Sequence, residues 1–249
     1  MKVAIVTGAG QGLGAACARD LANNGYSCAL MSPSERSERL AKEIGGIGLK
    51  GSSTSFADLK KLVETAMDAY GRIDAVVNNT GNLARIKPGT MLATGNAYDP
   101  HLDTDLLEIQ DHEWHDSLDF YFLNVIRMLR IVTPIMRTNG GGAIVNISSL
   151  AALEPRLSYP LSSPIRAATL AYTKIFADRY ARDGIRINNV LPGFMNSREF
   201  SAPVLQSIPI GRAGRVEELA HTVTFLLSPG AGYITGQSIL VDGGSNRRI

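Results

Sequence analysis

Short apolar runs bounded by turn residues alternate with segments of helical periodicity along most of this chain. The runs that we predict to be strands are Val3–Val6, Ser27–Met31, Asp74–Asn78, Gly142–Ile147, Arg186–Leu191 and Ser238–Val241. The segments that we predict to be helices are Leu13–Asn24, Phe56–Tyr70, Glu113–Thr138, Ala167–Arg182 and Val216–Leu227. Consecutive apolar residues are typical of strands covered on both faces. The pattern therefore predicts an α/β fold: a doubly wound parallel sheet with helices on both faces.

Length and composition narrow the class of protein. A chain of 249 residues is a normal size for one α/β sheet, so we expect residues 1–249 to form a single domain. The net charge is only +2, which argues against a nucleic-acid partner. No apolar stretch is long enough for a membrane span, and a strand that begins almost at the first residue leaves no room for a signal peptide. We therefore expect a cytoplasmic protein without a membrane partner.

A glycine-rich turn follows the first predicted strand. Residues 7–14 read TGAGQGLG and lead directly into the first predicted helix. Glycines let a backbone turn tightly and approach a pyrophosphate, whose charge is stabilised by the amides at the start of a helix. This strand–turn–helix context predicts a Rossmann-like dinucleotide site. The expected cofactor-binding residues of the turn are Gly8, Gly10, Gln11, Gly12, Leu13 and Gly14.

Several ordered motifs resemble the short-chain dehydrogenase/reductase family over almost the whole chain. They are the turn at 7–14, Asn78-Asn79-Thr80-Gly81, the strand ending in Ser148-Ser149, Arg186-Ile187-Asn188, Pro192-Gly193, residues 233–237 (YITGQ) and residues 241–244 (VDGG). The resemblance implies a nicotinamide dinucleotide cofactor. It adds Asn79, Gly81, Pro192 and Gly193 to the expected cofactor contacts, and it implies a catalytic serine at Ser149.

The rest of the catalytic apparatus of that family is substituted here. Aligned without gaps on the flanking helix, the family's catalytic tyrosine falls at Ser162 and its lysine at Arg166, while its asparagine falls at Tyr121. Serine is no useful acid at neutral pH, and arginine does not readily release a proton. Arg166 can still bind ribose hydroxyls, or a substrate carboxylate or phosphate, through its planar fork.

Two tyrosines are candidates for the missing acid. Tyr159 precedes Arg166 by seven positions, a spacing that resembles the Tyr-x6-Lys motif of divergent enoyl-acyl carrier protein reductases. Tyr121 stands where the family's asparagine points toward the serine and lysine. We predict that one of them faces the nicotinamide together with Ser149.

The end of the second strand favours NADP over NAD. A carboxylate there would hold the ribose 2′-hydroxyl of NAD, but this chain has Ser32. Ser32, Ser34 and Arg36 together offer donors to a 2′-phosphate. The acidic residue that the family places after the third strand is also missing, since Gly51 and Ser52 lie near its position.

An inserted loop at about 85–111 is expected to be a substrate lid or a subunit contact. It leaves the fourth strand at the ligand-binding end of the sheet. His101, His112 and His115 lie in or just after it among several acidic residues, but without the spacing of metal ligands, so we predict no metal site. His112 and His115 remain alternative proton donors if the loop folds inward.

Together these features predict an NAD(P)-dependent oxidoreductase acting on a small carbonyl, hydroxyl or conjugated alkene compound, possessing a non-standard catalytic set. One alternative is a dinucleotide-binding sensor or partner subunit that has lost hydride transfer. A further alternative is a non-redox lyase resembling the haloalcohol dehalogenases, which also carry arginine at the lysine position. The family resemblance implies a homodimer or homotetramer.

Overall fold

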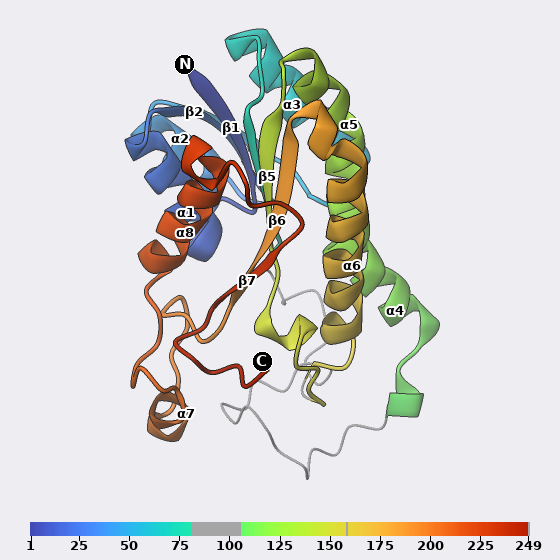
Figure 1. The fold of residues 1–249 in the computed structure, drawn as a ribbon, viewed down its shortest axis with the longest axis vertical. Helices are drawn as coiled ribbons and strands as arrows, with labels where there is room; N and C mark the ends of the chain where they lie inside the picture. Colours follow the sequence, from blue (N-terminus) through green and yellow to red (C-terminus); the bar gives the residue numbers. More distant parts are fainter. Residues whose placement is uncertain (81–105, 158, 249) are drawn as a thin grey trace.

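The structure, a computed structural model, describes residues 1–80, 106–157 and 159–248. A single seven-stranded sheet forms its centre (Figure 1), with the strand order β3-β2-β1-β4-β5-β6-β7 and every neighbouring pair parallel. The strands are β1 Lys2–Thr7, β2 Tyr26–Ser32, β3 Ile47–Lys50, β4 Ala75–Asn79, β5 Gly142–Ile147, β6 Ile185–Pro192 and β7 Ser238–Val241. The doubly wound α/β fold predicted from the sequence is confirmed.

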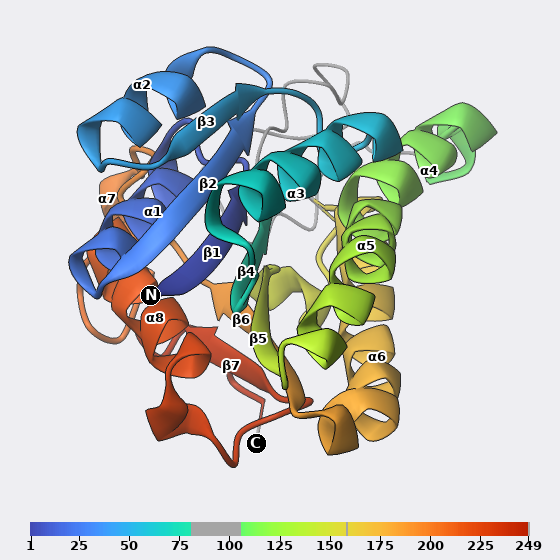
Figure 2. The same cartoon turned by 90° about the horizontal axis from the view of Figure 1, so that it is seen from above.

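Helices cover both faces of this sheet, as the end-on view in Figure 2 shows. On one face lie α1 Gly12–Asn23, α2 Arg36–Glu43 and α8 Val216–Leu227. On the other lie α3 Phe56–Tyr70, α5 Asn124–Thr138 and α6 Ser162–Tyr180. The shorter helices are α4 Asp111–Leu118 and α7 Ala202–Ser207, with single turns at Leu106–Glu108, Leu150–Ala152, Ala181–Asp183 and Pro229–Ala231. No helix of the described ranges is long and apolar enough to cross a membrane.

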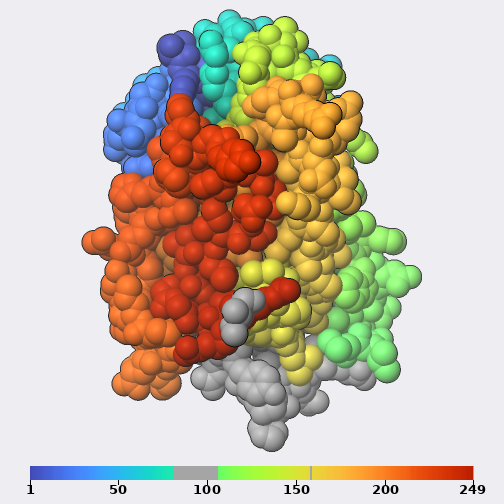
Figure 3. All heavy atoms as spheres, in the orientation of Figure 1, coloured from blue at the N-terminus to red at the C-terminus, as the bar shows by residue number. Residues whose placement is uncertain are grey.

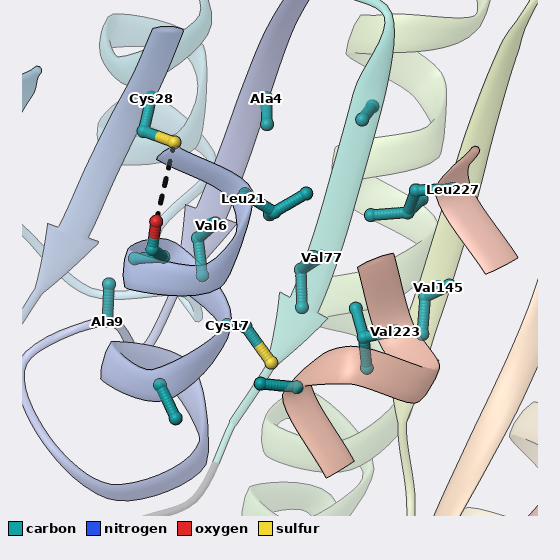
Figure 4. Close-up of a cluster of buried hydrophobic side chains, with 14 of the residues drawn as sticks. Ala4, Val6, Ala9, Cys17, Leu21, Cys28, Val77, Val145, Val223 and Leu227 are labelled. Atoms are coloured by element: carbon teal, nitrogen blue, oxygen red, sulfur yellow. Dashed lines mark hydrogen bonds between the residues drawn. The ribbon is translucent and has the colours of Figure 1, made fainter. Parts of the chain in front are cut away.

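Alternate residues of each central strand enter two separate cores. In β1, Ala4 and Val6 pack beneath α1 and α8, whereas Ile5 packs beneath α3 and α5. Cys17 and Cys28 are free thiols in the first core (Figure 4), where burial raises the pKa of Cys28 to about 12. A strand buried on both faces has no polar side, which explains why the sequence shows continuous apolar runs.

The predicted helix Glu113–Thr138 is wrong in one respect, because it is not a single α-helix. A π-helical segment at Asp119–Leu123 separates α4 from α5. A π segment inserts an extra residue into the helix and turns the following side chains, and such segments are frequent at functional sites. Tyr121 lies in the middle of this one and is buried, and the Thr169 hydroxyl of α6 donates to its carbonyl oxygen at 3.0 Å.

Three elements did not stand out in the apolar pattern: α2, β3 and α7. The strand β3 has only four residues, none of them fully buried, and it contains Gly48. A Cβ atom at Gly48 would lie 2.4 Å from the Glu38 Cα atom. The backbone of α2 therefore packs directly on the strand at a position where no side chain fits. Close packing of this kind leaves no periodic apolar signal.

Candidate active site at the carboxyl ends of the strands

The turn between β1 and α1 has the geometry of a phosphate cradle. Gly12 has φ +55°, a conformation that side chains rarely adopt, and it starts α1, whose first amides have no partner within the helix. A Cβ atom at Gly10 would lie 2.8 Å from the Ser32 Oγ atom and 3.1 Å from the Arg36 Cβ atom. The backbone therefore approaches the β2–α2 connection as closely as it can. These features fit the pyrophosphate of a dinucleotide.

A groove of about 770 Å³ runs beside this turn, between α1, α2 and α8. Its lining includes the residues Gly10, Gln11, Gly12, Arg36, Asn196 and Ser197. This volume lies within the range of small-molecule sites. The groove places the exposed start of α2 beside the cradle.

At that start, Ser34 and Arg36 are exposed, and the Arg36 Nη1 atom donates to the Gln11 Oε1 atom across the turn. In the described part of the chain Arg36 pairs with no carboxylate. Ser32 is buried, and its hydroxyl bonds to the Ser34 carbonyl oxygen at 2.7 Å and to the Ser37 hydroxyl at 3.0 Å. Ser32 therefore holds the turn together, and Ser34 and Arg36 are the donors that face solvent. A solvent-facing hydroxyl and a guanidinium that forms no ion pair in the described structure fit a phosphate monoester.

Sequence reasoning missed a carboxylate at the end of β3. The Ser52 amide donates to the Asp58 Oδ2 atom at 2.8 Å, so an acidic group lies beside the turn although none stands directly after the strand. Asp58 belongs to the first turn of α3. A first-turn carboxylate is stabilised by the helix dipole, and that preference was the available signal.

Arg166 and Tyr121 form the polar centre of the site. The Arg166 guanidinium carbon lies 4.4 Å from the centroid of the Tyr121 ring, a cation–π contact. Arg166 donates from Nη1 to the Ile147 carbonyl oxygen at 3.2 Å and from Nη2 to the Thr80 carbonyl oxygen at 3.5 Å. Ile147 ends β5 and Thr80 follows β4, so the guanidinium lies where ligands bind in parallel α/β sheets.

Burial dominates the electrostatics of this pair. It raises the pKa of the Tyr121 hydroxyl, and the positive charges of Arg166 and Arg198 oppose that effect only in part. Burial likewise lowers the pKa of Arg166, with Tyr121 acting in the opposite direction. Among the described residues only the Arg166 guanidinium interacts with the buried Tyr121 hydroxyl, and it makes no hydrogen bond of regular geometry to it. The phenol is protonated at neutral pH and remains available to a ligand.

The other predicted catalytic residues are positioned by their own elements: Ser149 follows β5, Tyr159 precedes α6 and Ser162 begins it. Ser149 caps the turn at Leu150–Ala152, where its Oγ atom accepts from the Ala151 amide at 3.2 Å. That bond leaves the hydroxyl proton free to be donated. Ser162 is the buried first residue of α6. Tyr159 is partly buried in the preceding turn, where its carbonyl oxygen accepts from the Ser163 amide. Of the two candidate phenols, the structure brings Tyr121 to Arg166.

Three of the expected cofactor residues have structural partners. The Asn79 Nδ2 atom donates to the Gly8 carbonyl oxygen at 3.0 Å and so fixes the glycine turn. Pro192 ends β6, and Gly193 packs against β7, because a Cβ atom there would lie 2.8 Å from the Asp242 Cα atom. Gly81 lies outside the described residues.

A row of buried amides beneath the site was also missed. The Asn146 side chain accepts from the Asn78 Nδ2 atom at 2.8 Å and donates to Thr173 and Asn189, each at 3.1 Å. Asn189 in turn donates to Ser238 at 3.1 Å. Asn78, Asn146, Asn189 and Ser238 are register partners on β4 to β7, so the network joins the four strands that carry this half of the site.

Most of the inserted loop at about 85–111, including His101, lies outside the described residues. His112 and His115 belong to α4 and are exposed. Within the ranges that the structure covers, no group of three histidine, cysteine or acidic side chains is placed to hold a metal ion.

Comparisons with known proteins agree with this arrangement. The family model described as enoyl-(acyl carrier protein) reductase matches residues 8–246. A 3-oxoacyl-[acyl-carrier-protein] reductase of Synechocystis is 32% identical, covering 98% of this chain and 96% of that protein. The chain belongs to the short-chain dehydrogenase/reductase family. The corresponding FabG reductases of Staphylococcus aureus and Vibrio harveyi are each 30% identical over 98% of this chain and cover 97% and 96% of their own lengths.

Membership of the short-chain dehydrogenase/reductase family confirms the resemblance seen in the sequence and the predicted class, an oxidoreductase. Relatives of this family span the whole chain, including the part that carries Tyr121, Ser162 and Arg166. The family assignment therefore rests on more than the cofactor turn.

Proposed function

We propose that this protein is an NADP-dependent oxidoreductase that interconverts a small carbonyl or conjugated alkene compound and its reduced form, with Tyr121 as the proton donor. The observation that carries this proposal is the contact between Arg166 and Tyr121 at the carboxyl ends of β4 and β5. A buried phenol whose hydroxyl makes no regular hydrogen bond in the described structure, beside a fixed cation, offers the two elements, an acid and a counter-charge, that the usual motif would supply.

The preference for NADP is supported by the donors at the start of α2. Ser34 and Arg36 would hold the 2′-phosphate, and the amides at the start of α1, from Gly12 to Gly14, would hold the pyrophosphate. When bound, the nicotinamide would supply or accept the hydride. The remaining steps belong to the protein's own side chains.

In the reducing direction, the Ser149 hydroxyl would donate a hydrogen bond to the substrate oxygen and orient it. The Tyr121 hydroxyl would then transfer its proton to the carbonyl oxygen or, for a conjugated alkene, to the alkene carbon next to the carbonyl, while the other alkene carbon would receive the hydride. Arg166 stabilises the phenolate that remains, because its guanidinium lies over the ring and its charge lowers the Tyr121 pKa. The raised pKa of Tyr121 favours reduction over oxidation at neutral pH, since the proton donor is loaded and the base form is scarce.

A turnover screen tests this function. We expect the wild-type protein to bind NADPH and to consume it with at least one member of a panel of small ketones, aldehydes and enones, followed by the loss of NADPH absorbance. Tight NADPH binding without turnover across the whole panel would instead support the sensor or partner-subunit alternative.

We also propose a homodimer or homotetramer. Exposed apolar side chains lie on two helices and before the last strand: Ile175 on α6, Phe225 on α8 and Tyr233 before β7, with 64%, 48% and 104% of their surface exposed. Parts of α6 and α8 both reach the surface shown in Figure 3. Burial of apolar side chains such as these drives the association of subunits. Light scattering during size-exclusion chromatography should give a mass of two or four chains, and a mass of one chain would refute the assembly.

A further inference from the structure

We propose that the substrate carries an anionic group, a carboxylate or a phosphate, that binds to Arg166 with help from Arg198. This inference rests on the proposed function and names the class of compound that the site would accept.

A guanidinium has five N–H donors in a planar fork. Besides its interaction with Tyr121, Arg166 makes two regular hydrogen bonds in the described structure, to the carbonyl oxygens of Ile147 and Thr80, and the second is long at 3.5 Å. Both acceptors are neutral, and no carboxylate of the described ranges forms an ion pair with Arg166. The side chain therefore retains donors and an uncompensated positive charge.

Arg166 is partly buried, and withdrawing such a charge from water is costly unless an anion or ordered water meets it. The Tyr121 ring covers one face of the guanidinium, which favours the cation but supplies no hydrogen-bond acceptor in the fork plane. The N–H donors that Arg166 does not use for Ile147 and Thr80 are complementary to a single group with two oxygens, while the Tyr121 hydroxyl remains for the carbonyl.

A second cation lies on the solvent side of the same place. Arg198 is exposed, and its charge acts on the Tyr121 hydroxyl. It stands one residue after Ser197, whose Cβ atom is the nearest neighbour of a Cβ atom built at Gly12, at 3.6 Å. Arg198 therefore belongs to a segment beside the cofactor turn and is near enough to Tyr121 for its charge to act on the hydroxyl.

Two basic groups without a described acidic partner favour an anion over a neutral compound. A planar guanidinium fork binds two oxygens of a carboxylate or a phosphate at once. The Arg166 position relative to Tyr121 would place that anion next to the carbonyl that receives the proton. A 2- or 3-oxo acid or a phosphorylated ketone has this spacing between anion and carbonyl.

Matched probes with and without the anionic group test this inference. Acetoacetate is compared with methyl acetoacetate, and dihydroxyacetone phosphate with dihydroxyacetone, by calorimetric titration of the NADPH-saturated protein and by kcat/KM wherever turnover occurs. We expect the anionic member of at least one pair to bind at least about tenfold more tightly than its neutral partner. The two pairs distinguish a carboxylate substrate from a phosphate substrate.

Variants separate this role from ribose binding and from a purely structural role. Arg166→Met should abolish the preference for the anionic probe, whereas Arg166→Lys should retain part of it. Arg198→Met, at an exposed position, should weaken binding of the anionic probe several-fold and leave the neutral probe unchanged. Arg130→Met, an exposed substitution on α5, is the control. If Arg166→Met does not fold by circular dichroism, Arg198→Met still provides the test.

Equal binding of charged and neutral probes, binding of neither, or a preference that survives both Arg166→Met and Arg198→Met would overturn the inference. Reduction of the neutral ketones with no preference for the anions would leave the proposed function intact. Absence of turnover with a clear preference for an anion in the titrations would overturn the enzymatic function but not the anion site.

Discussion

Replacing Arg36 with alanine should separate the two nicotinamide cofactors. Arg36 is exposed at the start of α2, donates to Gln11 across the glycine turn and pairs with no carboxylate in the described structure. If it contacts the 2′-phosphate of NADP, its loss removes one charge-assisted hydrogen bond. Such a bond contributes about 1–2 kcal/mol after a discount for solvent screening at an exposed site. The Kd for NADPH should therefore rise about 5- to 30-fold.

The assay is a fluorescence titration of each variant with NADPH and with NADH. NADH has no 2′-phosphate for Arg36 to bind. Loss of Arg36 can affect NADH through Gln11 of the glycine turn, so the Kd for NADH should change by less than about twofold. Arg130→Ala provides the control, because Arg130 is an exposed arginine on α5, which covers the opposite face of the sheet. An equal loss for the two cofactors, or no loss for NADPH, would refute the assignment of the 2′-phosphate to Arg36.

Three further predictions concern the turn, the pH profile and the amide row. Gly10→Ala should weaken NADPH binding, because the new methyl group must displace the Ser32 hydroxyl. Gly230→Ala should leave binding unchanged, because a Cβ atom there meets its nearest neighbour at 3.4 Å, an ordinary contact. Equal Kd values for the two variants in the same titration would contradict this prediction. Because the Tyr121 pKa is raised, kcat for reduction should stay level through neutral pH and fall only above that pKa. The rate of oxidation should increase as the pH rises, since the phenolate is then the base. A fall in the reduction rate near neutral pH would indicate another acid. Asn146→Ala should lower the free energy of unfolding in urea by about 2–4 kcal/mol, because buried partners of its side chain lose their bonds; a change below about 0.5 kcal/mol would show that the row is not structural.

The fold could be predicted from the sequence because its signals are local. Apolar runs such as Val3–Val6 and Gly142–Ile147 mark doubly buried strands, and the glycine turn marks the phosphate cradle. The short strand β3 was not predicted, because its Gly48 packs on α2, and this is a contact between separate segments of the chain. Side-chain periodicity does not register such a contact.

The site was predictable in part, for a similar reason. The spacing of the family motifs identified Tyr121 and Arg166 as substituted positions. It did not predict that the Arg166 guanidinium stacks on the Tyr121 ring. That contact depends on the π-helical segment at Asp119–Leu123 and on the distance between α6 and the helix that carries Tyr121. Helical periodicity alone predicts an uninterrupted helix there. The role of Asp58 was hidden too, because its carboxylate reaches back six residues to Ser52.

The claim that Tyr121 replaces the usual proton donor is tested most directly by kcat at saturating NADPH for Tyr121→Phe and Tyr159→Phe. The account predicts that Tyr121→Phe lowers kcat about 100-fold with little change in the Kd for NADPH, because a general acid is lost while the cofactor cradle is untouched. Tyr159→Phe should keep kcat within about threefold of wild type. Full activity of Tyr121→Phe, or a large loss confined to Tyr159→Phe, would contradict it.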